Sequence, residues 1–241
     1  MYKVVVSEFD RTLINSEEAI SSSTVMEIDR IRNMGCLFCI STDRFLSDIL
    51  SYNRDFIFTD YIICCSGAYL YDVLNDKVIY KKNITNVVLK KILDNFSDYD
   101  IYAYLEDRCW LIKDIIKEKI YKLEIVCPSK KILNSISEKL NELELNIKYF
   151  SKKTDKNYVL EIIMDSVDKS VCIEKICKLR KISMEEVVYI GALEKDIPMT
   201  KLVGYSVCMK NGDSTLKKQC SMICPSNDDK GVKFVLNKLF N

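Results

Sequence analysis

The sequence predicts an α/β protein, with a doubly wound, mostly parallel, Rossmann-like core sheet that carries an inserted α+β unit. Short apolar runs such as Val4–Val6 and Val187–Ile190 are typical of strands buried on both faces of a parallel sheet. In the first and last parts of the chain, such runs alternate with helical segments, as in βαβ units. Residues 82–165 instead show strands joined by short links, which indicates a separate inserted unit. The predicted core therefore comprises residues 1–81 and 166–241.

The first part of the chain shows a strand, a helix and a second strand in succession. Ser21–Ser23 offer hydroxyl groups that can cap the start of the helix, and Gly35 provides its stop. This order is that of a βαβ unit in a parallel sheet. The expected elements are a helix over Thr24–Met34, a strand over Cys36–Ile40, a helix over Leu46–Tyr52, a strand over Tyr61–Cys65, and a hairpin of Tyr69–Tyr71 with Val78–Tyr80.

The inserted unit mixes helices and strands, and its apolar stripes at helical spacing predict core positions. Trp110 and Tyr104 are possible ligand contacts, but core packing is the expectation for both. The expected elements are Val87–Phe96, Ile101–Tyr104, Trp110–Ile112, Leu123–Val126, Ser129–Leu140, Ile147–Phe150 and Tyr158–Ile163. After it, we expect a helix from Lys169, strands over Val187–Ile190, Tyr205–Met209 and Met222–Cys224, and a closing helix over Gly231–Phe240.

Composition and charge exclude several classes of protein. Lys and Arg number 36 against 35 for Asp and Glu, so no charge excess favours nucleic acid or an acidic membrane surface as a partner. No apolar run reaches membrane-spanning length, and the first residues lack the pattern of a signal peptide. The 11 cysteines lie mostly within apolar runs without paired C-x-x-C motifs, which favours reduced thiols over a zinc site. The expected location is the cytoplasm.

The chain contains no histidine, which restricts the chemistry available to it. Ser–His and Cys–His nucleophile pairs and histidine metal ligands are excluded. Any catalysis must use carboxylates, lysine, hydroxyl groups, or a hard metal ion held by oxygen atoms.

Polar side chains follow the first two predicted strands of the core. Glu8 and Asp10 come at the end of the first strand, and Thr42 and Arg44 follow the second. In an open parallel sheet, ligands bind beyond the carboxyl ends of the strands. These residues therefore form a candidate site, and a solvated polar turn is the alternative interpretation.

Separated motifs together resemble one family. A strand precedes E-F-D-R-T (Glu8–Thr12), a second precedes S-T-D-R (Ser41–Arg44), Lys169 opens a helix, and a later strand precedes G-A-L-E-K-D-I-P-M (Gly191–Met199). In this order they resemble the D-x-D-G-T, T-G-R, lysine and G-D-x-x-N-D pattern of the haloacid-dehalogenase superfamily, Cof type. The resemblance spans the whole chain and makes residues 82–165 an α/β cap.

The resemblance implies a magnesium-dependent phosphatase of small phosphorylated metabolites. It gives Glu8 the place of the nucleophile that forms an acyl-phosphate, and Asp10 that of the general acid and base. Thr42 and Lys169 would hold phosphoryl oxygens. Oxygen atoms of Glu8, Asp10 and Asp196 would hold the metal ion, and the cap would cover the site.

Several residues depart from the family pattern where the chemistry takes place. Glu8 replaces the nucleophilic aspartate, and its additional methylene displaces the attacking oxygen by about 1 Å, which can lower a rate ~10²-fold. Ala192 replaces a magnesium-binding aspartate and offers no ligand. Arg11 and Asp43 replace glycines, and Lys195 replaces asparagine. The residues that match are Asp10, Thr12, Thr42, Arg44, Lys169 and Asp196.

These departures suggest that fixed cations partly replace the metal ion. Arg11 and Lys195 add positive charge, so a phosphate or carboxylate anion could bind together with Thr42, Arg44 and Lys169, while magnesium binds weakly or not at all. Two functions remain open: a phosphatase with slow or no turnover, and a non-catalytic phospho-ligand-binding or regulatory protein. Single residues also have alternative interpretations. Arg11 and Lys195 can be solvated surface charges, and Asp196 can be an ordinary helix-terminal charge. Glu194 can be a substitute metal ligand.

Overall fold

The computed structural model describes residues 2–52, 57–114 and 116–241, and it confirms the predicted α/β class. Within these residues, an 8-stranded sheet has the order β13-β12-β11-β1-β2-β3-β4-β5. Its strands are parallel from β13 to β3, and β4 and β5 extend it as an antiparallel hairpin. These strands are β1 (Val4–Glu8), β2 (Leu37–Ser41), β3 (Tyr61–Cys64), β4 (Tyr69–Asp72), β5 (Lys77–Lys81), β11 (Val187–Gly191), β12 (Tyr205–Met209) and β13 (Met222–Cys224).

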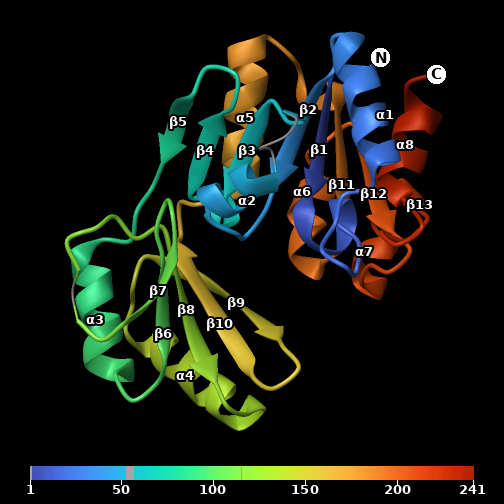
Figure 1. Ribbon diagram of the computed structural model, residues 1–241. Helices are drawn as coiled ribbons and strands as arrows, with labels where there is room; N and C mark the ends of the chain where they lie inside the picture. Colours follow the sequence, from blue (N-terminus) through green and yellow to red (C-terminus); the bar gives the residue numbers. More distant parts are fainter. Residues whose placement is uncertain (1, 53–56, 115) are drawn as a thin grey trace.

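Helices cover both faces of this sheet, which explains the continuous apolar composition of β1 (Figure 1). Val5 packs in the hydrophobic cluster that includes Ile28 of α1 and Val235 of α8. Val4 and Val6 point to the opposite face and pack in the cluster of α5. The helices of the core are α1 (Ser22–Asn33), α2 (Leu46–Tyr52), α5 (Lys169–Arg180), α6 (Ile197–Thr200), α7 (Ser214–Lys217) and α8 (Gly231–Leu239).

A 5-stranded antiparallel sheet with the order β7-β6-β8-β10-β9 lies between β5 and α5 in the sequence. We call residues 82–165 the cap and the remainder the core; the boundaries themselves stay a prediction. In the helix expected over Val87–Phe96, the apolar side chains at helical spacing, Leu89, Ile92 and Phe96, are buried, as expected for a helix that packs on a sheet. The cap elements are α3 (Asn86–Phe96), β6 (Ile101–Tyr104), β7 (Cys109–Ile112), β8 (Lys122–Cys127), α4 (Lys130–Glu142), β9 (Ile147–Lys153) and β10 (Tyr158–Met164).

The prediction of core packing for Trp110 is wrong. Its side chain is 54% exposed on the edge strand β7, where the guanidinium of Arg108 lies 5.3 Å from the ring centroid. Tyr104 is half-buried, and the ammonium group of Lys122 lies 3.6 Å from its ring centroid. Both rings therefore contact cations of the cap.

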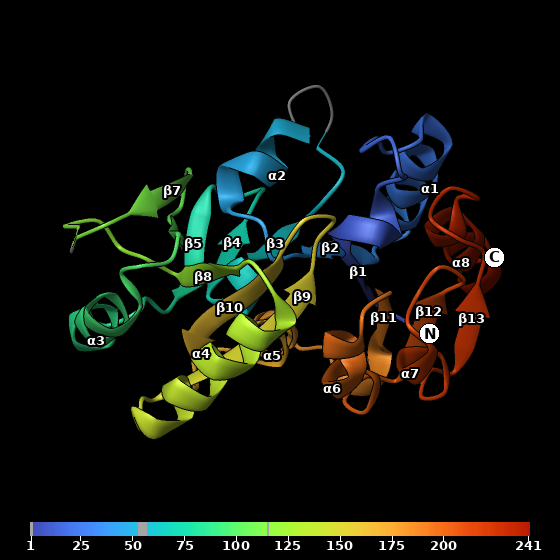
Figure 2. The ribbon, with the colours of Figure 1, turned by 90° about the horizontal axis from the view of Figure 1, so that it is seen from below.

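Viewed from below, the cap sheet lies against one end of the core (Figure 2). One face of the cap sheet packs on α3 and α4 through residues such as Leu123 and Ile125, and alternate residues of the same strand point the other way. Among the latter, Lys122 is buried and donates a hydrogen bond of 2.9 Å to the backbone oxygen of Asp43 in the core. No helix in the described part of the chain has the length and apolar character needed to cross a membrane.

Candidate functional site

The carboxyl ends of β1, β2 and β11 bring the predicted site residues to one edge of the core sheet. These three strands are adjacent and parallel, so the residues that follow them meet at the same edge. Glu8 is the last residue of β1, the segment Thr42–Arg44 follows β2, and Asp196 lies in the turn after β11.

Lys169 lies between two buried carboxylates. Its Nζ donates a hydrogen bond of 2.5 Å to Glu8 Oε2 and lies 3.5 Å from Asp196 Oδ1. The side chains of Lys169, Glu8 and Asp196 are 8%, 1% and 0% exposed, respectively. A lysine ammonium therefore occupies the space between two of the three residues for which the sequence predicted metal ligation.

The position of Lys169 follows from the way α5 begins. Asp168 caps the helix, because its Oδ1 accepts a hydrogen bond of 2.9 Å from Ser170 N. Gly67 (φ +97°) packs directly on this turn, where an added Cβ would lie 2.6 Å from Lys169 N. Only glycine combines this conformation with so close an approach.

The carboxylate of Asp196 is saturated with hydrogen-bond donors. Its Oδ2 accepts from the backbone nitrogens of Ala192 at 3.1 Å and Leu193 at 3.0 Å, and its Oδ1 accepts from the Tyr189 hydroxyl at 2.8 Å. Gly191 leaves the necessary room, because a Cβ there would lie 2.6 Å from Asp196 Oδ2. Asp196 is thus an internal, fully bonded group and not a solvated helix-terminal charge.

Burial and charge shift the protonation equilibria of this cluster. Burial raises the pKa of Glu8 to about 7, although the nearby charge of Lys169 opposes the shift. Burial, the largest single effect, lowers the pKa of Lys169, but Glu8, Tyr189 and Asp196 together outweigh it and hold that pKa well above its usual value. Lys169 therefore remains a fixed cation at neutral pH.

Asp10, the predicted general acid and base, lies in a separate ion pair. Arg44 donates from Nη2 to Asp10 Oδ1 at 2.7 Å, and its Nε lies 3.1 Å and 3.2 Å from the two carboxylate oxygens. Arg44 also contacts Asp48 at 3.2 Å. Thr42 is fully buried, and its hydroxyl accepts a hydrogen bond of 3.1 Å from Arg44 N. The geometry thus joins Asp10, Thr42 and Arg44 in one group beside the Glu8 cluster.

The two added cations lie at different places. Arg11 has a half-exposed side chain that donates to Asn211 O at 2.9 Å and lies 3.9 Å from Asp213. Its φ of +58° is a left-handed conformation, which glycine adopts readily at the position where the family pattern has one. Lys195 forms an ion pair with Asp43, so two departures from the family pattern neutralise each other.

The residues present do not fit a magnesium ion. Mg²⁺ needs several oxygen ligands in octahedral geometry, but three oxygens of Glu8 and Asp196 accept hydrogen bonds from protein donors, and the Lys169 ammonium lies among them. Ala192 supplies no oxygen, and Asp10 is engaged by Arg44. In the described ranges, no cluster of three or more acidic, cysteine or histidine side chains is suited to a metal. Glu194, the alternative ligand, is exposed.

Sequence reasoning missed Tyr189, Ser66 and Glu161. Tyr189 lies within an apolar strand, where an aromatic ring indicates only core packing. The hydroxyl of Ser66 lies within hydrogen-bond distance of Asp43 and of Glu161, which is buried in the cap. The position of Glu161 inside the apolar run of β10 is the feature that could have revealed it, because a charge is buried only with a partner.

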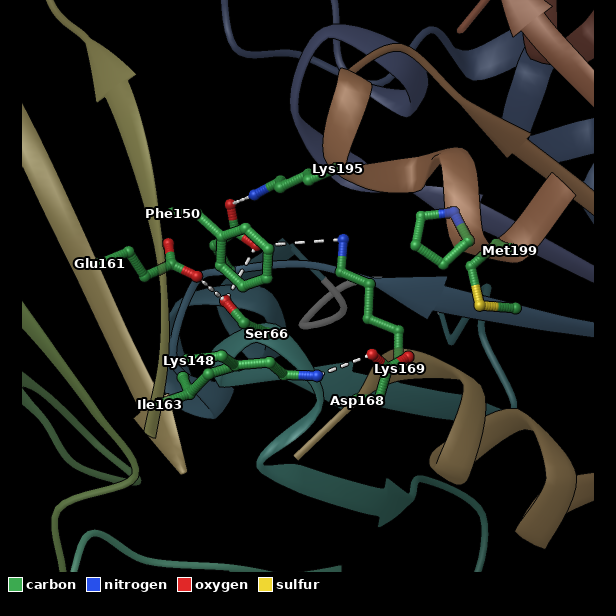
Figure 3. A pocket seen from close by; sticks show the side chains of 11 residues that line it. Ser66, Lys148, Phe150, Glu161, Ile163, Asp168, Lys169, Lys195 and Met199 are labelled. Atoms are coloured by element: carbon green, nitrogen blue, oxygen red, sulfur yellow. Dashed lines mark hydrogen bonds and ion pairs between the residues drawn. The ribbon is translucent and has the colours of Figure 1, made fainter. Parts of the chain in front are cut away.

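Two neighbouring cavities share part of their lining beside this cluster, and Figure 3 shows the side chains around the inner one. The inner one has a volume of about 50 Å³ and is lined by Lys169, Ser66 and Glu161 among others. The outer one, about 770 Å³, lies between the loop of Lys195 and strand β9 of the cap, including Lys152. Asp43, Phe150, Glu161, Lys195 and Pro198 line both. The outer cleft has the size of a small-molecule site, and the inner one does not.

Comparison with known proteins decides the family. A family model described as haloacid dehalogenase-like hydrolase matches residues 5–124 and 107–236. The chain belongs to the haloacid dehalogenase-like hydrolases. The resemblance inferred from the motifs is therefore confirmed.

Known relatives of this hydrolase extend over nearly its whole length. A 5-amino-6-(5-phospho-D-ribitylamino)uracil phosphatase of Bacillus subtilis is 22% identical, with 99% of this chain and 97% of the relative covered. A phosphoglycolate phosphatase of Methanobrevibacter smithii is 24% identical, with 97% of each covered. The crystal structure of a haloacid dehalogenase-like hydrolase from Bacteroides thetaiotaomicron has a TM-score of 0.87 at 22% identity and covers 100% of both chains. The last comparison shows that the fold is shared.

Proposed function

We propose that this haloacid dehalogenase-like hydrolase is a phosphatase-type protein that acts on small phosphorylated metabolites with slow or no turnover. Its relatives include phosphatases of two chemically different metabolites, which supports the class of reaction without selecting a substrate. Lys169 lines the inner cavity and offers a cation for phosphoryl oxygens, and the carboxylate of Glu8, the proposed nucleophile, is buried behind it in contact with its ammonium group. The membership in the family alone does not fix the activity.

In the proposed reaction, Glu8 attacks phosphorus, and an acyl-phosphate forms as the bond to the leaving alcohol oxygen breaks. Asp10 gives a proton to that oxygen, then takes one from the water that hydrolyses the acyl-phosphate and regenerates Glu8. Turnover is slow because the attacking carboxylate must first leave its contact with Lys169, and Asp10 must leave Arg44.

The observation that carries the proposal is the contact of 2.5 Å between Lys169 Nζ and Glu8 Oε2. An ammonium at this place keeps positive charge in the pocket without a divalent ion, so an anion can bind there. It cannot orient an in-line attack as a coordinated metal does. We therefore propose that the protein still binds anions in this pocket, while its rate of hydrolysis is strongly reduced.

Hydrolysis of p-nitrophenyl phosphate with magnesium tests the proposal. We expect slow activity in the parent protein, loss in Glu8→Ala, and an increase when Glu8→Asp is combined with Ala192→Asp, which restores two carboxylates of the family pattern. Activity that persists in Glu8→Ala would come from another source and would contradict the assigned nucleophile.

The second candidate function is a non-catalytic phospho-ligand-binding or regulatory protein. The bidentate contact between Arg44 and Asp10 favours it, since a general acid and base held in this way is poorly placed to exchange protons. No hydrolysis by the parent protein, together with retained phosphate binding, would select this function.

We also propose a reducing compartment, with the cytoplasm as the expected location. All 11 cysteines are free, and most of them are buried as small apolar groups. Nucleic acid remains an unexpected partner because the net charge is only +1.

A further inference from the structure

We propose that the carboxylate of Asp43 is an internal anion that occupies the phosphoryl-binding position, so that a phosphorylated ligand must displace it. This regulation of the site rests on the proposed function above. Asp43 thereby acts as an autoinhibitory group within the pocket.

The contacts of Asp43 are those expected of a bound anion. Its Oδ2 forms an ion pair with Lys195, and its Oδ1 lies 3.0 Å from Ser66 Oγ, a hydroxyl group that Glu161 also contacts, and 3.9 Å from Lys169 Nζ. In Figure 3 the side chains of Lys195, Ser66 and Lys169 converge from separate segments on one region between core and cap. Two ammonium groups and a hydroxyl group are the donors that a phosphoryl group would also use.

The space around Asp43 supports the same conclusion. The inner cavity next to it has a volume of about 50 Å³. This volume is well below the ~300 Å³ or more of typical small-molecule sites, so it is too small for a phosphorylated metabolite. Because Asp43 also lines the outer cleft of about 770 Å³, withdrawal of its side chain would join the two spaces.

The backbone of Asp43 is held while its side chain can move. Its backbone oxygen accepts a hydrogen bond of 2.9 Å from the buried Lys122 of the cap. The side chains of Asp43 and Lys195 are each 18% exposed, so water reaches the pair from the outer cleft. Displacement therefore requires a side-chain rotation at the cleft wall and leaves the core sheet unchanged.

The sequence departs from the family pattern at this position. Asp43 stands between Thr42 and Arg44, where the family pattern T-G-R has a glycine without a side chain. A ligand that binds only when Asp43 has withdrawn has an apparent affinity reduced by the fraction of molecules in that state. If about one molecule in ten is in that state, the apparent Kd is about tenfold higher.

Isothermal titration with inorganic phosphate, at neutral pH with a chelator present, tests the inference. We expect Asp43→Gly and the isosteric Asp43→Asn to bind phosphate about tenfold more tightly than the parent protein. Glu194→Gln is the matched control, because it removes an exposed negative charge from the same outer cleft without touching Lys169. It should change the Kd by less than about twofold.

A second titration separates displacement from general electrostatics. In Asp43→Gly, acetate should compete with phosphate, because it restores a carboxylate to the vacated position, and in the parent protein it should compete far less. If the parent binds phosphate and neither Asp43 variant binds it more tightly, the inference is wrong and the proposed function stands. If no variant binds phosphate, both are overturned.

Discussion

At the residue scale, three buried charges decide what the pocket can hold. Lys169 contacts Glu8 at 2.5 Å and Asp196 at 3.5 Å, and Tyr189 donates to Asp196 at 2.8 Å. Removal of one partner from such a cluster leaves an uncompensated buried charge, which costs more than the attraction gained by the pair. Each of the three charged side chains is therefore required by the others, and the protonation state of the cluster affects the stability of the folded protein.

The raised pKa of Glu8 predicts a pH dependence of stability. The pKa rises from 4.5 to about 7 on burial, so between these values the folded protein binds a proton that the unfolded chain has released. The free energy of unfolding should therefore fall as the pH rises from 5 to 7, by about 2 kcal/mol from this group, and level off above it.

Urea unfolding of the parent and of Glu8→Gln at several pH values measures this contribution. The variant cannot titrate at this position, so its free energy of unfolding should fall less steeply over the same interval. Parallel curves for the two proteins would show that Glu8 does not titrate there. Carboxyl groups with a lowered pKa, such as Glu124, stabilise the folded protein and lose this contribution only at lower pH, and they do so equally in the parent and the variant.

At the scale of elements, the ends of adjacent parallel strands assemble the site, and the start of α5 completes it. The apolar runs predicted these elements closely: α2 and β6 have the expected bounds, and β2 is displaced by one residue. Local composition determines such elements, since a run of β-branched residues or a helical stripe needs no knowledge of distant partners.

The partners across the chain could not be predicted in this way. Ser66 and Glu161 are 95 positions apart, and Lys195 and Asp43 are 152 apart. The first pairing depends on how the cap meets the core, and the second on how the loops after β2 and β11 meet at the edge of the core sheet. Neither arrangement is encoded as a local sequence pattern. The prediction for Trp110 was wrong for a related reason. An aromatic residue on an edge strand has the sequence pattern of a core residue, and the two cases are distinguished only by the order of the strands in the sheet.

Gly67 provides a test of how α5 positions Lys169. Gly67→Ala would place a Cβ 2.6 Å from Lys169 N and force a positive φ on alanine. We expect a loss of about 3 kcal/mol in the free energy of unfolding and several-fold weaker phosphate binding. Urea unfolding measures the change in stability, and isothermal titration with inorganic phosphate measures the change in binding.

Gly35→Ala is the control, because Gly35 also has a positive φ of +87° but open space around its Cβ position. It should cost only about 1 kcal/mol and leave phosphate binding unchanged. Equal effects of the two substitutions would mean that the contact with α5 is unimportant.

At the scale of the whole molecule, buried charges of the cap meet the core directly above the site. Lys122 is 1% exposed and contacts Glu124 at 3.0 Å, Glu161 at 3.5 Å and the backbone of Asp43. Figures 1 and 2 show the cap on one side of the core. Buried ion pairs and a hydrogen bond thus join the cap to the site.

Lys122→Met should lower the free energy of unfolding by about 3–5 kcal/mol, since Glu161 would lose its ion-pair partner and Glu124 would keep only the half-exposed Lys152. The exposed Lys119→Met should change it by less than about 0.5 kcal/mol. Urea unfolding compares the two variants. A loss below about 1 kcal/mol in Lys122→Met would show that these carboxylates are stabilised without it.

The central claim is that Lys169, and not a divalent ion, supplies the positive charge between Glu8 and Asp196. Titration of the parent protein with inorganic phosphate, once with magnesium and once with a chelator, tests it most directly. We predict that phosphate binds with the same Kd, within about twofold, in both conditions. Binding that occurs only with magnesium would contradict the account.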